Sequence, residues 1–173
     1  MKFYASINSI IFGFLFSCSV AMETPLDLEK SAEQGNAIAI IQMASKKSIQ
    51  GKYREGLAMF QRYHIRLAQD DACCTDKSLG MSALNQIEKV LYNQQQKAFL
   101  VYFRDLSQAE YNKLFHEQLD WIDSKMKSDV PLPEPMWLET YCLSENKKDL
   151  FVPSSEWFAK RAEVITQFRS KLG

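Results

Sequence analysis

Two histidines and two pairs of acids are the residues of this sequence whose chemistry could support catalysis. His116 has Asp120 one helical turn later, a spacing that can orient an imidazole. His64 falls on an apolar stripe, where a core or boundary histidine is the commoner role. The acid pairs are Asp70 with Asp71 and Asp120 with Asp123. In a pair of carboxyl groups, one can act as the general acid and the other as the general base or nucleophile. We expect the first pair at a helix end and the second on a solvated helix face, and neither place favours catalysis.

No nucleophile, metal or cofactor motif accompanies these residues. The sequence has no G-x-S-x-G, no H-E-x-x-H and no glycine-rich phosphate loop. Cys73 and Cys74 are adjacent and lack the two-residue spacer that lets two thiolates face one zinc ion. The sequence therefore predicts a protein that is not an enzyme and that uses no cofactor.

The first 21 residues have the layout of a secretory signal peptide. Lys2 supplies a positive charge, residues 10–16 an apolar run too short to cross a bilayer, and Ser19-Val20-Ala21 a cleavage site of small residues. We expect residues 22–173 to form a single helical domain in the periplasm, with Met22 as its first residue. Alternatively, Leu15-Phe16-Ser17-Cys18 resembles the lipobox of bacterial lipoproteins, which implies anchoring through Cys18.

Charge excludes a nucleic-acid binder. The whole sequence balances 21 basic against 21 acidic side chains, and cleavage after Ala21 would leave 20 against 21, a net charge of −1. No later apolar run approaches the length of a membrane span, so the sequence predicts none in the mature protein.

Three cysteines remain after cleavage, in a compartment that favours disulfides. Adjacent cysteines bridge each other only through a strained ring, so we expect one bond between Cys142 and either Cys73 or Cys74. Which thiol stays unpaired is left open.

Apolar residues recur at helical spacing along most of the mature sequence. The expected helices cover residues 36–49, residues 53–70, a stretch capped by Thr75 that runs past Val101, residues 107–126 after a Ser107–Glu110 capping box, and a segment that starts near Ser154. The prolines within residues 130–135 cannot continue a helix. The prediction is an all-α, compact bundle of about five helices: a helical hairpin, a longer antiparallel pair and a C-terminal helix with a wide apolar face that includes Phe158.

An acidic, proline-stiffened stretch precedes that last helix. Residues 128–156 hold six acids against two lysines, a net charge of −4, whereas residues 157–173 carry +3. Stiff loops bind at low entropic cost, and tryptophan is enriched in binding hot spots. The predicted partner-binding residues are Asp129, Glu134, Trp137 and Glu139. The alternative is that the acids are merely solvated and that Trp137 belongs to the core.

Residues 32–39 (AEQGNAIA) and 51–60 (GKYREGLAMF) resemble one unit of the SEL-one-like repeats, which are related to tetratricopeptide repeats. In these repeats small residues let two helices approach closely. The resemblance, over residues 32–70, implies a scaffold for protein contacts.

The rest of the mature chain faintly resembles the LprI-like lysozyme-inhibitor family of small exported helical proteins. The matching residues occur in the family's order: Leu84-Asn85, Gln118 to Trp121, Lys125 in place of an arginine, Cys142-Leu143 and Arg161 to Ile165. The resemblance implies an inhibitor of a wall-degrading enzyme.

Together these features predict a non-enzymatic periplasmic protein that binds another protein. Its most concrete form is an inhibitor or immunity protein against a secreted, basic cell-wall-degrading enzyme of the lysozyme or amidase type. The alternative is a periplasmic scaffold or adaptor that uses its hairpin. A groove lined by Tyr53, Phe60 and Tyr63 would favour the scaffold, and a protruding acidic loop would favour the inhibitor. The sequence predicts no oligomeric state.

Overall fold

The computed structural model describes residues 25–75, 97–135, 137–138 and 150–172. The predicted signal peptide, Cys18, Glu139 and Cys142 lie outside this part. The elements are α2 (Pro25–Glu33), α3 (Ala37–Ile49), α4 (Tyr53–Ala72), α6 (Lys97–Asp105), α7 (Gln108–Met126), the short 3-10 helix η3 (Ser154–Glu156) and α8 (Trp157–Leu172). The described residues contain no strand, which confirms the predicted all-α bundle.

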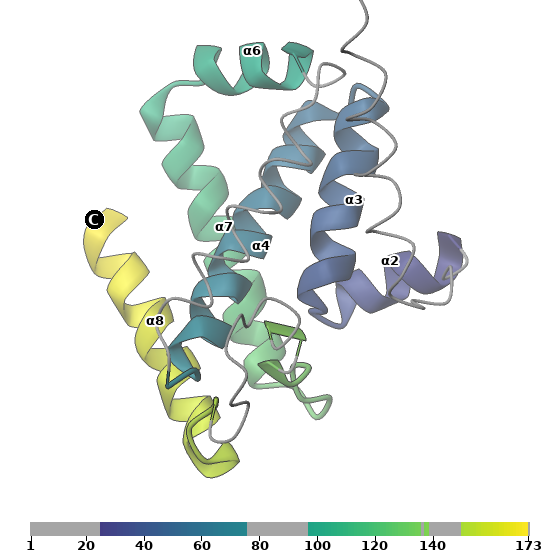
Figure 1. Ribbon diagram of the computed structural model, residues 1–173. Helices are drawn as coiled ribbons and strands as arrows, with labels where there is room; N and C mark the ends of the chain where they lie inside the picture. The colour runs from purple at the N-terminus through teal and green to yellow at the C-terminus, as the bar shows by residue number, and fades with distance from the viewer. Residues whose placement is uncertain (1–24, 76–96, 136, 139–149, 173) are drawn as a thin grey trace, which may run out of the picture.

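Helix α4 runs through the middle of the bundle (Figure 1). It packs against α3 on one side and against α7 and α8 on the other. Its buried residues are therefore not confined to one stripe: Tyr63, Ile65 and Leu67 are all at most 5% exposed. Because a helix enclosed in this way has little solvated face, its polar side chains must also find partners inside the protein.

The predicted hairpin is present as α3 and α4, and its first helix has the expected bounds. Asn36 caps α3 by accepting from the Ala39 N–H at 3.0 Å. Gly35, just before this cap, has φ +87°, a conformation that favours glycine. A Cβ at this position would lie 2.6 Å from Leu132 Cδ2, so glycine also lets the loop after α7 pack closely here.

The predicted capping box starts α7. Ser107 Oγ accepts from the Glu110 N–H at 3.2 Å, and Glu110 Oε2 accepts from the Ser107 N–H at 3.1 Å. Before it, α6 lies across one end of the bundle, at a steep angle to α7 (Figure 1). The rest of the predicted third helix lies outside the described residues, so its antiparallel pairing with α7 stays a prediction. The Thr75 hydroxyl donates to the Leu150 carbonyl at 3.0 Å.

The C-terminal helix begins where the sequence predicts, with η3 at Ser154 leading into α8. Val164 and Ile165 are buried against its neighbours, but Phe158 is 60% exposed, so its predicted place on the buried face is wrong. Phe158 lies in the first turn of α8, before the stretch that the bundle covers. The sequence did not predict α2, whose Ala32 packs against α3 in the core.

Candidate functional site

The most enclosed charged group in the described part of the protein is the carboxylate of Asp70, near the end of α4. Its side chain is 0% exposed and accepts four hydrogen bonds. Arg66 Nη2 donates to both oxygens at 2.9 Å, and Arg161 Nη2 on α8 donates to Oδ1 at 2.7 Å. Trp137 Nε1 donates to Oδ2 at 2.7 Å. We call these four residues the Asp70 cluster, and it links α4, α8 and the chain after α7.

The Asp70 cluster carries two guanidinium groups and one carboxylate. Burial lowers the pKa of Arg66 to about 10 while the Asp70 carboxylate acts to raise it, so Arg66 stays charged at neutral pH. The Pro133 carbonyl accepts from Arg161 Nη2 at 2.7 Å and from Arg66 Nη2 at 3.3 Å. Gln69 Oε1 accepts from Arg66 Nη1 at 3.2 Å. The surplus positive charge is thus directed at the backbone of the loop that contains Pro133.

This loop, residues 127–135, is held against the bundle by its last residues, whereas its first residues are exposed to solvent. Leu132 and Pro135 are buried, and the Pro133 carbonyl is held by the two arginines. Residues 128–131 are all exposed, with Val130 60% exposed. Ser128 Oγ lies 2.7 Å from the Lys125 carbonyl and 2.9 Å from that of Val130, which orders the turn itself. We call residues 128–131 the loop tip.

The structure separates the predicted partner-binding residues. Asp129 belongs to the loop tip, and Glu134 is exposed beside it. Trp137 is half-buried: its indole N–H binds Asp70, and its ring packs with Tyr63 in the core at a centroid distance of 6.4 Å. Glu139 lies outside the described residues. The exposed apolar residue next to the acids is therefore Val130, and a partner contact by Trp137 stays a prediction.

Three of the four acids considered for catalysis, Asp70, Asp120 and Asp123, are engaged in ion pairs. Asp70 is enclosed as described, and Asp120 accepts from Arg169 Nη2 at 2.8 Å. Asp123 lies 2.8 Å from Lys127 Nζ. His64 is half-buried against the ring of Phe60, at a centroid distance of 4.5 Å, and burial lowers its pKa. These contacts assign structural partners to the acids and a packing role to His64.

The sequence does not predict the Asp70 cluster, because the local spacing of its residues resembles a surface pattern. Arg66 and Asp70 are spaced i, i+4, like many exposed helical ion pairs, and Arg161 lies 91 residues after Asp70. The one available signal was the apolar residues of α4 that fall off its main stripe, Tyr63 and Ile65, which indicate an enclosed helix.

Cys73 and Cys74 are both buried at the end of α4. The chain around them pairs with the segment before η3: Thr75 N donates to the Leu150 carbonyl, and Val152 N donates to the Cys73 carbonyl, each at 2.8 Å. Leu138 and Leu150 pack in the same core cluster as Cys74. Cys142 lies between these two leucines in sequence but outside the described residues, so its disulfide stays a prediction.

Within the described residues, no group of three or more His, Cys, Asp or Glu side chains could hold a metal ion. None of the described helices is long and apolar enough to cross a membrane. Tyr63 is 0% exposed, so the groove of Tyr53, Phe60 and Tyr63 that would favour a scaffold is not formed.

No protein family, curated protein or solved structure matches the chain. The resemblances to SEL-one-like repeats and to LprI-like inhibitors therefore stay predictions.

Proposed function

We propose that this protein binds another protein through the loop tip and Glu134, and that the partner is basic. The observation that carries the proposal is the contrast within residues 127–135: buried arginines hold the Pro133 carbonyl, while Asp129, Val130 and Pro131 are exposed. A loop ordered before binding loses little conformational entropy when a partner docks.

The chemistry of the loop defines the partner. Asp129 and Glu134 offer two exposed carboxylates, and Val130 offers an apolar contact between them. Acids at the rim of an interface accelerate association with a basic protein, whereas a buried apolar contact slows dissociation. The partner class that fits is a basic enzyme that degrades the cell wall, of the lysozyme or amidase type, and the protein would act as its inhibitor or immunity protein.

The periplasmic setting of this proposal rests on the sequence, through the signal-peptide layout of residues 1–21. The exported chain is expected to begin at Met22, which intact mass measurement checks. A chain that begins at an acylated Cys18 would replace the soluble form by a lipoprotein anchored at the membrane.

Binding kinetics to a panel of purified basic lysozymes and amidases test the proposal. Asp129→Lys with Glu134→Lys should slow association by roughly tenfold at low salt and leave dissociation nearly unchanged. Asp105→Lys with Glu117→Lys is the matched control, because it makes the same charge change at two exposed acids of α6 and α7. Val130→Ala should speed dissociation, and the wild type should inhibit wall hydrolysis by the enzyme it binds.

Two outcomes would contradict the proposal. Equal slowing by both double variants would mean that net charge acts rather than the loop tip. Failure of the protein to bind or inhibit any enzyme of the panel would contradict a wall-degrading enzyme as the partner and would favour the scaffold alternative.

A further inference from the structure

A second feature of the bundle lies away from the loop tip and does not depend on the proposed function. Helices α4, α6, α7 and α8 line a half-open cavity of about 500 Å³. Its walls are mainly aromatic and apolar: Phe60, Leu67, Phe103, Tyr111, Phe115 and Phe168. This volume lies within the usual range for small-molecule sites, which is roughly 300–1,000 Å³.

The aromatic rings of the wall contact one another in a row. Ring centroids are 5.8 Å apart for Phe103 and Tyr111, 6.0 Å for Tyr111 and Phe115, and 5.4 Å for Phe115 and Phe168. Phe103 is 44% exposed, so the row runs from the surface into the bundle. A flat aromatic molecule could pack along such a row with edge and face contacts.

Two polar atoms at this cavity are buried and have no hydrogen-bond partner, Gln61 Oε1 and His64 Nε2. Gln61 is only 1% exposed, and its Nε2 donates to the Tyr111 carbonyl at 3.3 Å, which fixes its Oε1 as the unused acceptor. A buried acceptor without a donor costs free energy, because the atom has given up its hydrogen bonds to water. A ligand that supplies the donor would recover this free energy.

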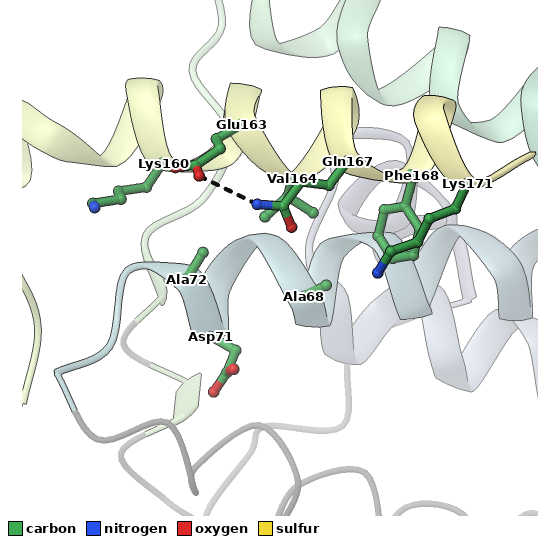
Figure 2. Close-up of a pocket in the computed structure, with 9 residues that line it drawn as sticks. All are labelled: Ala68, Asp71, Ala72, Lys160, Glu163, Val164, Gln167, Phe168 and Lys171. Atoms are coloured by element: carbon green, nitrogen blue, oxygen red, sulfur yellow. Dashed lines mark hydrogen bonds between the residues drawn. The ribbon is translucent and has the colours of Figure 1, made fainter.

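The neighbouring hollow between α4 and α8 has a different character (Figure 2). Ala68, Asp71 and Phe168 line both spaces, but the hollow adds the charged residues Lys160, Glu163 and Lys171. Figure 2 shows Ala68 and Ala72 directed from α4 towards α8, and the bond of 3.2 Å from Gln167 Nε2 to Glu163 Oε1 along α8. Four charged residues line the hollow, against Asp71 alone in the aromatic cavity, so the aromatic cavity is the better candidate for an apolar ligand.

We propose that the aromatic cavity binds an uncharged, mainly aromatic small molecule whose hydrogen-bond donor pairs with Gln61 Oε1, with His64 Nε2 as a second polar contact. The ring row provides the apolar area, and the two unpartnered atoms provide orientation. This site binds a ligand of a different class from the basic protein that we propose for the loop tip.

The probe for this proposal is N-phenyl-1-naphthylamine, an uncharged diaryl amine with one N–H donor, titrated by fluorescence into the full mature chain. We expect saturable binding of one probe per protein. Ala68→Trp, which fills the cavity, should weaken binding at least tenfold. Ala72→Trp is the matched control, because Ala72 lines only the neighbouring hollow, and it should bind like the wild type.

Two further measurements test the polar contact. 1-Benzylnaphthalene, in which a CH2 group replaces the N–H, should displace the probe from the wild type with an inhibition constant about five- to tenfold higher than the dissociation constant of the probe itself. Gln61→Met should remove this difference between the two compounds. This comparison stands even if Ala68→Trp fails to fold, which thermal melting would show.

No saturable binding by the wild type would overturn the proposal. An equal loss of probe affinity in Ala68→Trp and Ala72→Trp would show that the ligand does not bind in the aromatic cavity. Equal affinity of the two compounds for the wild type would exclude the hydrogen bond to Gln61.

Discussion

Two stretches of α4 bury polar side chains in different settings. Near the C-terminal end of the helix, the Asp70 carboxylate accepts four hydrogen bonds and the arginines that bind it also hold the Pro133 carbonyl, although Arg66 Nε and Arg161 Nε are buried without partners. In the middle of the helix, Gln61 Oε1 and His64 Nε2 are buried without partners beside a half-open cavity. A carboxylate with four donors fixes the elements around it, whereas an unpartnered atom beside a cavity is a cost that a ligand can remove. The C-terminal stretch therefore positions a loop, and the middle stretch borders a cavity that is open to binding.

The strongest test of this comparison is Asp70→Asn. The variant leaves the two guanidinium groups of the Asp70 cluster buried without their carboxylate, and we expect a loss of about 3–5 kcal/mol in the free energy of unfolding. Asp120→Asn is the control, since its exposed pair with Arg169 should contribute at most about 1 kcal/mol. Urea unfolding measures both. Equal losses would show that the buried cluster does not hold the bundle together.

The predicted disulfide would add a covalent link at the same end of α4. If Cys142 is bonded to Cys73 or Cys74, Cys142→Ala should cost about 2–5 kcal/mol. Peptide mapping without reduction should find one such bond, and thermal melting with and without reductant should show the same loss. Three thiols that all react with a labelling reagent in the unfolded, unreduced protein would refute the bond.

Trp137→Phe separates the two interpretations of this tryptophan. It keeps an aromatic ring against Tyr63 but removes the N–H that binds the Asp70 carboxylate, a bond to a charged group worth about 1.5–3 kcal/mol. A lower melting temperature with unchanged dissociation from a partner would identify Trp137 as core. Faster dissociation with unchanged melting would instead make it a partner contact.

Substitution of Gly35 tests the second contact that holds the loop, the packing of Leu132 against Gly35. Gly35→Ala and Gly51→Ala each place alanine at positive φ, but a Cβ at Gly51 meets nothing within 4 Å whereas one at Gly35 meets Leu132. The Gly35 variant should therefore lose about 1–3 kcal/mol more than the Gly51 variant, because Leu132 must move. It should also weaken partner binding if Leu132 orders the loop tip. Equal losses in urea unfolding would show that Leu132 adapts freely.

The sequence predicts those parts of the fold that depend on local patterns. The Ser107–Glu110 capping box and the spacing of apolar residues locate α3, α4, α7 and α8, because caps and stripes act within a few residues. The Asp70 cluster joins positions 66, 70, 137 and 161, which meet only after α8 and the loop pack on α4. The cavity likewise needs rings from four helices. Contacts of this range leave no periodic signal, so sequence reasoning found the exposed acids of the loop but not what holds them.

The smallest expected effect concerns His64, in the middle of α4, through the pH dependence of stability. Burial lowers the pKa of His64 below the usual histidine value of 6.5. As the pH falls through that value, the unfolded chain binds a proton before the folded protein does, so stability falls below pH 6.5 and is unaffected above it. The slope from one such proton cannot exceed about 1.4 kcal/mol per pH unit. His64→Phe should remove this contribution, whereas His116→Gln keeps His64 and should retain it. Urea unfolding of the three proteins at pH 7.5 and pH 5.5 measures the difference. An unchanged pH dependence in His64→Phe would mean that His64 can take up a proton in the folded state at no cost, which would place its imidazole in contact with water rather than buried against Phe60.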